Sequence, residues 1–241
     1  MILIIILAFV LITIFFTQRS SIVVIRGVSI TDPRIADTKS KTSCPCYTIL
    51  DGESGEEGVF THTEDTCKRI NPLHKSIKYS LDSVLWHVYE NVKDKDFDYL
   101  WLLEDDVYVD GSLDDVIRKN SHRNDEFLAS FVEDYGENEK ELNWMWWEAL
   151  DGSTETPPAL ENRVKSFFPV TRYSKRFLKE IHTRIGVYSG YCEVYIPTLA
   201  KQLGYTYGNL EDDSIGDLSL RVIDPMPQNG DGRLYHKWAK K

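Results

Sequence analysis

The most constraining feature of the sequence is a short apolar run that ends in three acidic residues. Residues 99–103 read YLWLL and lead directly into Glu104, Asp105 and Asp106. An apolar run of this length, bounded by charged residues, predicts a strand buried on both faces. Three neighbouring carboxylates repel one another and are costly to desolvate. We therefore expect these acids at the end of the strand, facing solvent.

The neighbouring segments place this strand in an α/β domain. Residues 21–26 form a β-branched run, and residues 47–50 form a second apolar run that stops at Asp51 and Gly52. Both predict strands. Residues 75–92 carry apolar side chains at helical spacing. The order of strand, helix and strand predicts an α/β fold with a mostly parallel mixed sheet flanked by helices.

The remaining pattern is less regular. Residues 53–65 are acidic and glycine-rich, which predicts a surface loop. Helices are expected over residues 113–119, 174–185 and 193–203, with Pro197 suited to a first turn. The aromatic residues 143–150 precede a Gly, Ser, Thr and Pro-rich stretch to 158, a candidate flexible lid. A turn-rich segment at 224–232 and a tail at 233–241 follow.

The first residues predict a membrane anchor. Residues 2–16 are apolar apart from Thr13, and no small-x-small cleavage pattern precedes Arg19. We therefore expect an uncleaved signal anchor over residues 1–20, and a single-pass membrane protein of the Golgi or endoplasmic reticulum with a luminal body. Arg19 and Arg26 follow the apolar run and oppose that orientation.

Charge and cysteines limit the classes of partner. A net charge of -10 without a basic stripe argues against nucleic acid. Cys44, Cys46, Cys67 and Cys192 lack the spacing of a zinc site. In an oxidising lumen Cys67 could pair with Cys44 or Cys46, whereas in a reducing compartment all would be free thiols. The sequence leaves both open.

Acids at the carboxyl end of a strand in an α/β sheet are typical of a ligand site. Mg²⁺ and Mn²⁺ prefer such oxygen ligands and complete their shell with phosphate oxygens. The simpler alternative is that the acids only cap the following turn. A calcium loop starting at Asp106 is excluded, because Tyr108 and Ile117 occupy positions that need oxygen ligands.

Residues 99–111 (YLWLLEDDVYVDG) resemble the metal-binding strand of GT-A-fold glycosyltransferases, a Rossmann-related fold. The Asp-x-Asp motif of that family takes the form Glu-Asp-Asp in the N-acetylglucosaminyltransferase I type. The resemblance implies that Asp106 ligates Mn²⁺ or Mg²⁺, that Glu104 holds the first motif position, and that Asp105 contacts the donor ribose or sugar. It further implies a nucleotide-binding half at 21–111 and an acceptor-binding half at 112–241 within one domain, 21–241.

Two more segments extend the resemblance. Residues 190–205 are similar to the helix that carries the acidic motif of the family, with Glu193 at the position of the catalytic base and Cys192 replacing an acid. Glu193 could instead serve only the helix N-terminus. Residues 234–237 (LYHK) resemble the C-terminal segment whose histidine, here His236, completes the metal shell. Lys237 would then hold the diphosphate.

Several cationic and acidic residues outside these motifs are also candidates. Arg26 and Asp51 end predicted strands and are expected to contact the nucleotide base or ribose. Arg172 and Arg176 could face a ligand phosphate or an acidic acceptor, or simply be solvated.

The sequence therefore predicts a metal-dependent glycosyltransferase of hexosyl or N-acetylhexosaminyl type. It would use a nucleotide-diphosphate sugar and a glycan, protein or lipid acceptor. An inverting course with Glu193 as base is expected, and a retaining course stays open. The alternatives are a metal-dependent hydrolase or phosphatase, and a noncatalytic membrane-tethered module whose aromatic residues 144–147 stack on glycans.

Overall fold

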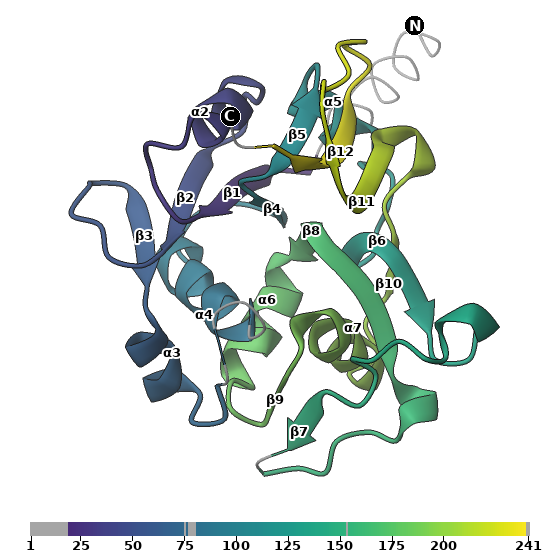
Figure 1. Ribbon diagram of the computed structural model, residues 1–241. Coiled ribbons are helices and arrows are strands. Elements are labelled where there is room, and N and C mark those ends of the chain that lie inside the picture. Colours follow the sequence, from purple (N-terminus) through teal and green to yellow (C-terminus); the bar gives the residue numbers. More distant parts are fainter. Residues whose placement is uncertain (1–18, 75, 77–80, 153, 240–241) are drawn as a thin grey trace, which may run out of the picture.

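A computed structural model of the protein describes residues 19–74, 76, 81–152 and 154–239. Its centre is a seven-stranded sheet in the order β10-β6-β8-β4-β1-β2-β3 (Figure 1). Neighbouring strands are parallel except for β8, which runs antiparallel to both β4 and β6. The predicted mixed, mostly parallel sheet is confirmed. The strands are β1 (Ser21–Gly27), β2 (Cys46–Asp51), β3 (Val59–His62), β4 (Tyr99–Glu104), β6 (Phe127–Asp134), β8 (Val164–Ser174) and β10 (Tyr207–Asn209).

Both faces of the sheet are covered, as the apolar runs require. On β1, Ile22 and Val24 face one core and Val23 and Ile25 face the other, all nearly inaccessible to solvent. Helices α4 (Leu81–Val92), α6 (Lys175–Thr183) and α7 (Cys192–Gln202) contribute to the first core. Helices α2 (Pro33–Ser40) and α5 (Leu113–Lys119) contribute to the second. Burial of alternate side chains on opposite faces is what fixes the register of such strands.

A small sheet in the order β11-β12-β5 covers part of the second face (Figure 1). It consists of β5 (Val107–Asp110), β11 (Ile215–Ile223) and β12 (Arg233–Trp238). Strand β12 is antiparallel to β5 and parallel to β11. Because β5 follows the acidic residues after β4, this pairing brings residues from the end of the chain beside them. Helix α3 (Glu64–Ile70) and a two-stranded antiparallel sheet of β7 (Leu150–Gly152) and β9 (Tyr188–Gly190) complete the described elements outside short 3₁₀ turns.

The structure corrects several sequence expectations. The predicted loop at 53–65 contains β3 and the start of α3, whose first turn is capped reciprocally by Thr63 and Thr66. Pro197 lies inside α7 rather than in its first turn. Residues 233–238 of the predicted tail form β12, and β6, β8 and β11 were not predicted as strands. The helix expected over 75–92 is present from Leu81, and its first part lies largely outside the described residues.

The anchor predicted for residues 1–20 lies almost wholly outside the described residues, since these begin at Arg19. Within the described part of the chain, no helix combines the length and apolar character needed to cross a membrane. All four cysteines are described, and all are free thiols. The disulfide considered for Cys67 is therefore not formed in this structure.

Candidate metal and substrate site

Three parallel strands end in charged side chains that meet at one edge of the sheet. Arg26 of β1 lies opposite Glu104 of β4 in the strand register. Its guanidinium forms a two-pronged pair with Asp51 of β2, with Nε–Oδ1 and Nη2–Oδ2 distances of 3.0 and 2.8 Å. Arg26 Nη1 also lies 3.7 Å from Glu104 Oε1. The adjacent parallel positions of β4, β1 and β2 bring these groups together, because parallel strands align their carboxyl ends.

Asp51 is held ionised by two neighbours. His62 lies opposite Asp51 in the β2–β3 register, and its Nε2 lies 2.9 Å from Asp51 Oδ1. Burial raises the pKa of Asp51, but His62 and Arg26 outweigh it and bring the pKa below its ordinary value. The Asp51 carboxylate is therefore held in position, in its charged form, at this side of the site.

The carboxyl end of β4 also meets β12. Residue His236 lies opposite Val107 in the β12–β5 register, and the Trp238 N–H donates to the Asp106 carbonyl at 2.7 Å. As a result, one ligand atom each of Glu104, Asp106 and His236 lie within 4.8 Å of one another. The sequence proposed Asp106 and His236 as metal ligands, and the geometry adds Glu104 to that group.

The hydrogen bonding of His236 defines which ring nitrogen faces the cluster. Nδ1 lies 2.6 Å from the Ser219 carbonyl oxygen, which can only accept. Nδ1 therefore carries the hydrogen, and in the neutral ring Nε2 directs a lone pair towards Asp106 Oδ1 at 3.4 Å. Burial lowers the pKa of His236, yet the Asp106 carboxylate more than compensates and the pKa lies above its ordinary value.

Asp106 supplies the test of whether these residues fit a cation. Its Oδ1 is buried and has no hydrogen-bond partner among the residues that the structure describes. An unsatisfied buried carboxylate oxygen is rare in a protein and needs a partner. Two carboxylates and an imidazole whose other nitrogen is anchored to a carbonyl form a donor set that suits a divalent cation such as Mn²⁺. Glu104, Asp106 and His236 therefore fit a divalent cation.

Asp105 lies to one side of this cluster. Its Oδ2 lies 3.4 Å from Arg34 Nη2 of α2, and a Cβ on Gly27 would come within 3.1 Å of that same oxygen. The close approach of β1 to Asp105 therefore depends on Gly27. Lys237 lies on the other side, half-exposed, with Nζ 3.9 Å from Asp106 Oδ2.

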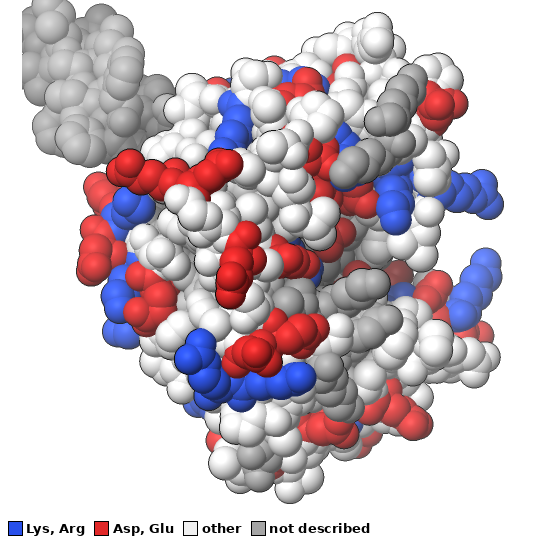
Figure 2. Space-filling view, turned by 60° about the vertical axis from the view of Figure 1, so that its left-hand side comes forward, with Lys and Arg blue, Asp and Glu red and all other residues white. Residues whose placement is uncertain are grey.

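One cavity of about 400 Å³ gathers the residues expected to contact the donor. We name it the donor cavity. Its lining consists of Arg26, Gly27, Val28, Asp51, Glu104, Asp105, Asp106 and Lys237. Acidic side chains predominate over basic ones across the centre of the face in Figure 2, which turns the left-hand side of Figure 1 forward.

Glu193 lies in the first turn of α7, beside the candidate metal ligands. It is 9% exposed, and its Oε1 accepts a hydrogen bond from the Phe168 N–H at 3.1 Å. The pKa of Glu193 is raised to about 7, chiefly by burial and in smaller part by Glu104, against the lowering effects of Phe168, Tyr191 and Lys165. A second cavity of about 190 Å³ is lined by Glu193 together with Glu104, Asp106, His236 and Lys237. The candidate base and the candidate ligands thus share one space.

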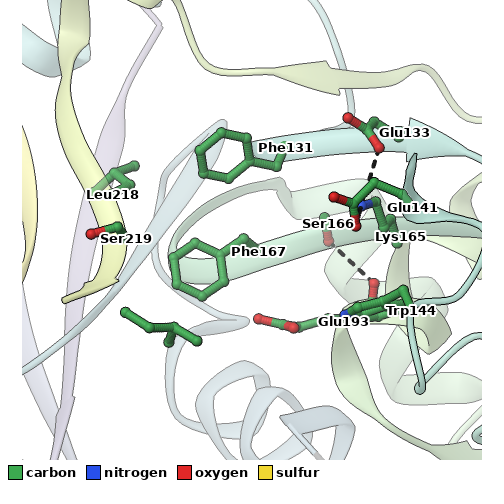
Figure 3. Close-up of a pocket in the computed structure, with 11 residues that line it drawn as sticks. Phe131, Glu133, Glu141, Trp144, Lys165, Ser166, Phe167, Glu193, Leu218 and Ser219 are labelled. Atoms are coloured by element: carbon green, nitrogen blue, oxygen red, sulfur yellow. Dashed lines mark hydrogen bonds and ion pairs between the residues drawn. The ribbon is translucent and has the colours of Figure 1, made fainter. Parts of the chain in front are cut away.

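A third cavity of about 360 Å³ also reaches Glu193, and no sequence motif predicted it as a whole (Figure 3). We name it the acceptor-side cavity. Only Trp144, from the predicted aromatic cluster, and Glu193 had been singled out. The complete lining is Phe131, Glu133, Glu141, Trp144, Lys165, Ser166, Phe167, Glu193, Leu218, Ser219 and Leu220.

The two arginines considered for phosphate binding lie elsewhere. Arg172 is 2% exposed and donates to the backbone carbonyls of Asn120, Arg123 and Asp125. Arg176 pairs with Glu126 beside the amino end of β4, opposite the acidic cluster. Arg172 fits neither alternative, because the buried β8 directs it at an edge of the core, where it satisfies loop carbonyls. Arg176 is largely exposed, as the solvated alternative expects.

The fold and this geometry define a mixed α/β protein with a candidate divalent-cation site at the carboxyl edge of its sheet. No family model matches the chain, and no curated protein matches it. A solved structure described as "Crystal structure of a glycosyltransferase involved in the glycosylation of the major capsid of PBCV-1" is similar at 11% identity, over 90% of this chain and 92% of that one, with a TM-score of 0.38. So loose a superposition carries no weight for activity.

Proposed function

We propose that the protein is a metal-dependent glycosyltransferase that moves a sugar from a nucleotide-diphosphate donor to an acceptor hydroxyl. One observation carries the proposal. Glu104, Asp106 and His236 converge around a buried carboxylate oxygen that has no hydrogen-bond partner in the described structure, and Glu193 borders the same space. A cation site and a carboxylate with a raised pKa, adjacent to one another in a cleft, are a functional combination.

The donor cavity supports a nucleotide-diphosphate ligand. Mn²⁺ or Mg²⁺ held by Glu104, Asp106 and His236 would neutralise charge on a departing diphosphate. Lys237 is half-exposed at the same cavity and can donate to a phosphate oxygen. Arg26 and Asp51 would contact the nucleoside at the carboxyl edge of the sheet, and Asp105 its ribose or the sugar.

Glu193 would act as the base. Its pKa of about 7 leaves a substantial carboxylate fraction at neutral pH while keeping it basic enough to accept a proton. The acceptor oxygen would bond to the anomeric carbon as the bond from that carbon to the diphosphate oxygen breaks. The hydroxyl proton would pass to Glu193, and the diphosphate would leave with the bonding electron pair. A direct displacement of this kind inverts the anomeric configuration.

The membrane location, the division into halves and the type of sugar are proposed from the sequence. Residues 1–20 would anchor a catalytic domain of residues 21–241 in a Golgi or endoplasmic reticulum membrane, with the body in the lumen. Residues 21–111 would form the nucleotide-binding half and 112–241 the acceptor-binding half. The transferred group would be a hexosyl or N-acetylhexosaminyl unit.

Isothermal titration of the full chain with a panel of nucleotide-diphosphate sugars tests the proposal. Binding is expected only with Mn²⁺ or Mg²⁺ present, and a donor-hydrolysis screen on the same panel would identify the sugar. Binding of nucleotide sugars that is indifferent to metal, or no binding at all, would overturn it. A hydrolase or phosphatase would instead release phosphate or sugar without preferring any acceptor.

A further inference from the structure

The acceptor-side cavity has two chemically different ends. Towards Glu193, the rings of Phe131 and Phe167 lie with centroids 6.2 Å apart, and Leu218 and Leu220 of β11 line the cavity as well. Figure 3 shows both rings and the Glu193 carboxylate directed into the same space. The far end is charged and contains Glu133, Glu141 and Lys165, a group that we name the charged end. A ligand that fills this cavity must therefore be amphipathic.

Phe131 is held in an unfavourable backbone conformation at this cavity. Its φ is +52°, a left-handed conformation that a bulky residue rarely adopts. The β6–β8 register shifts on both sides of Ser130, and Asn209 holds the next residue, with Oδ1 2.7 Å from the Val132 N–H and Nδ2 3.3 Å from its carbonyl oxygen. A strand irregularity of this kind re-aims a side chain, and such strain concentrates at ligand sites.

The orientation that this strain produces exposes the ring instead of burying it. Phe131 is 55% exposed, although its neighbours Ser130 and Val132 are buried. Packing in the core therefore does not explain the conformation. Presentation of the aromatic ring to a ligand explains the conformation of Phe131.

The charged end carries a surplus of negative charge. Lys165 Nζ lies 2.7 Å from Glu141 Oε2 and 3.1 Å from Glu133 Oε2, so one ammonium is shared by two carboxylates. Glu193 adds a third acid at the other end. An anionic ligand would meet repulsion at both ends, whereas hydroxyl groups could donate to the carboxylates.

We propose that the acceptor-side cavity binds a neutral pyranose of a glycoside acceptor. The C–H face of the sugar packs against Phe131 and Phe167, and its hydroxyls donate to Glu133 and Glu141. This assignment rests on the proposed function, because one further hydroxyl must lie at Glu193. A purely apolar lipid would leave the carboxylates of the charged end unsatisfied, so a lipid chain is not the occupant of this cavity.

Saturation-transfer NMR on the full chain in nanodiscs, without donor, tests the assignment directly. The probes are neutral methyl hexopyranosides, the matching methyl uronosides and a short prenyl alcohol. Transfer is expected to the ring C–H protons of a neutral glycoside, and weakly or not at all to its uronoside. Equal binding of the uronoside, or binding of the prenyl alcohol alone, would overturn the proposal.

Variants at Phe131 provide the structural test. Phe131→Asn suits the left-handed backbone and removes the ring, so it is expected to weaken glycoside binding about 10-fold without loss of the fold. Phe131→Tyr keeps the ring and is expected to retain binding. Val222→Ala is the matched control, because Val222 is 60% exposed on β11 and does not line the cavity. Equal affinities for Phe131→Asn and Val222→Ala would contradict the assignment.

The same samples separate this inference from the proposed function. Metal-dependent titration with a nucleotide-diphosphate sugar reports on the donor cavity alone. Donor binding without glycoside binding would overturn only the acceptor assignment. Glycoside binding without donor binding would overturn the glycosyltransferase proposal and leave a glycan-binding cavity.

Discussion

The donor cavity and the acceptor-side cavity are built in different ways, and the small cavity of about 190 Å³ shares lining residues with both. The donor cavity takes its charged groups from the ends of β1, β2 and β4, which are adjacent parallel strands. The acceptor-side cavity takes its residues from β6, β8, β11, the segment 141–144 and α7, and it includes an irregular strand. Convergence of charge therefore follows from chain topology. The amphipathic cavity depends instead on how distant elements pack, and on local strain.

The largest expected effect is the loss of a candidate ligand in the donor cavity. Asp106→Asn should lower turnover about 10³-fold or more, because a metal ligand and its charge are both removed. The protein should remain folded, because the amide keeps the shape of the carboxylate and loses only its attraction to His236 and Lys237. Steady-state kinetics with Mn²⁺ and thermal unfolding would measure the two effects.

Asp105→Asn is the matched control for that variant, because Asp105 lies 3.4 Å from Arg34 and outside the ligand group. It should cost less turnover than Asp106→Asn. Full activity in Asp106→Asn would show that turnover does not depend on a cation held by Asp106 in the donor cavity.

The next effect concerns Glu193, which lines the acceptor-side cavity and the small cavity that contains Glu104 and Asp106. Glu193→Gln should lower turnover about 10²-fold while donor affinity is unchanged, because the amide keeps the shape and loses the basicity. In the wild type, turnover should rise with pH through about 7 as the carboxylate forms. Donor titration and a pH profile of both proteins would test this. A rise through the same pH range in Glu193→Gln would assign the titration to another group.

Glu193 should also make stability depend on pH. Burial raises its pKa from 4.5 to about 7, so the native state retains a proton that the unfolded chain releases. The contribution of the protonated Glu193 to the free energy of unfolding is complete below about pH 4.5. It is lost as the pH rises towards 7, and the loss is at most about 3 kcal/mol. Urea unfolding should show the stability of Glu193→Gln relative to the wild type increasing over this range. A difference in unfolding free energy between the two proteins that stays constant with pH would contradict the raised pKa of Glu193.

The smallest effect is structural and lies on the acceptor side. At a φ of +52°, Phe131→Gly should be more stable than Phe131→Ala by about 1 kcal/mol, because glycine has no Cβ to strain that backbone. Chemical denaturation of the two variants measures the difference directly. Alanine more stable than glycine would show that the backbone relaxes freely, and would remove strain as a distinguishing property of this cavity.

The sequence predicted the donor side better than the acceptor side, for physical reasons. The apolar run at 99–103 bounded by charges favours a buried strand, and the parallel neighbours β4, β1 and β2 bring Arg26, Asp51 and the acids to one edge. His236 was proposed only through a family resemblance, because no periodicity in the sequence indicates that β12 pairs with β5. Its register beside Asp106 depends on contacts between residues about 130 positions apart.

The missed strands had weak signals. Strand β8 includes Pro169 and Arg172, which are unusual in a central strand, and Arg172 was read as solvated or ligand-facing instead of as a buried donor to carbonyls. Strand β3 has only four residues and follows a glycine-rich stretch. The left-handed conformation of Phe131 has no sequence signal at all, since neither glycine nor asparagine occupies that position.

One aromatic ring lies between the candidate metal ligands and the acceptor-side cavity. Phe167 lies edge-on to His236, with centroids 5.5 Å apart, and it also faces Phe131. A ligand that displaces this ring from one side alters the surroundings of the other, and thermodynamic linkage makes such an influence mutual. We therefore expect cooperative substrate binding, in which donor with metal changes acceptor affinity by the same factor as the reverse. Titration of each ligand in the presence of the other would measure that factor, and a value of one would mean that the ring insulates the two halves of the cleft.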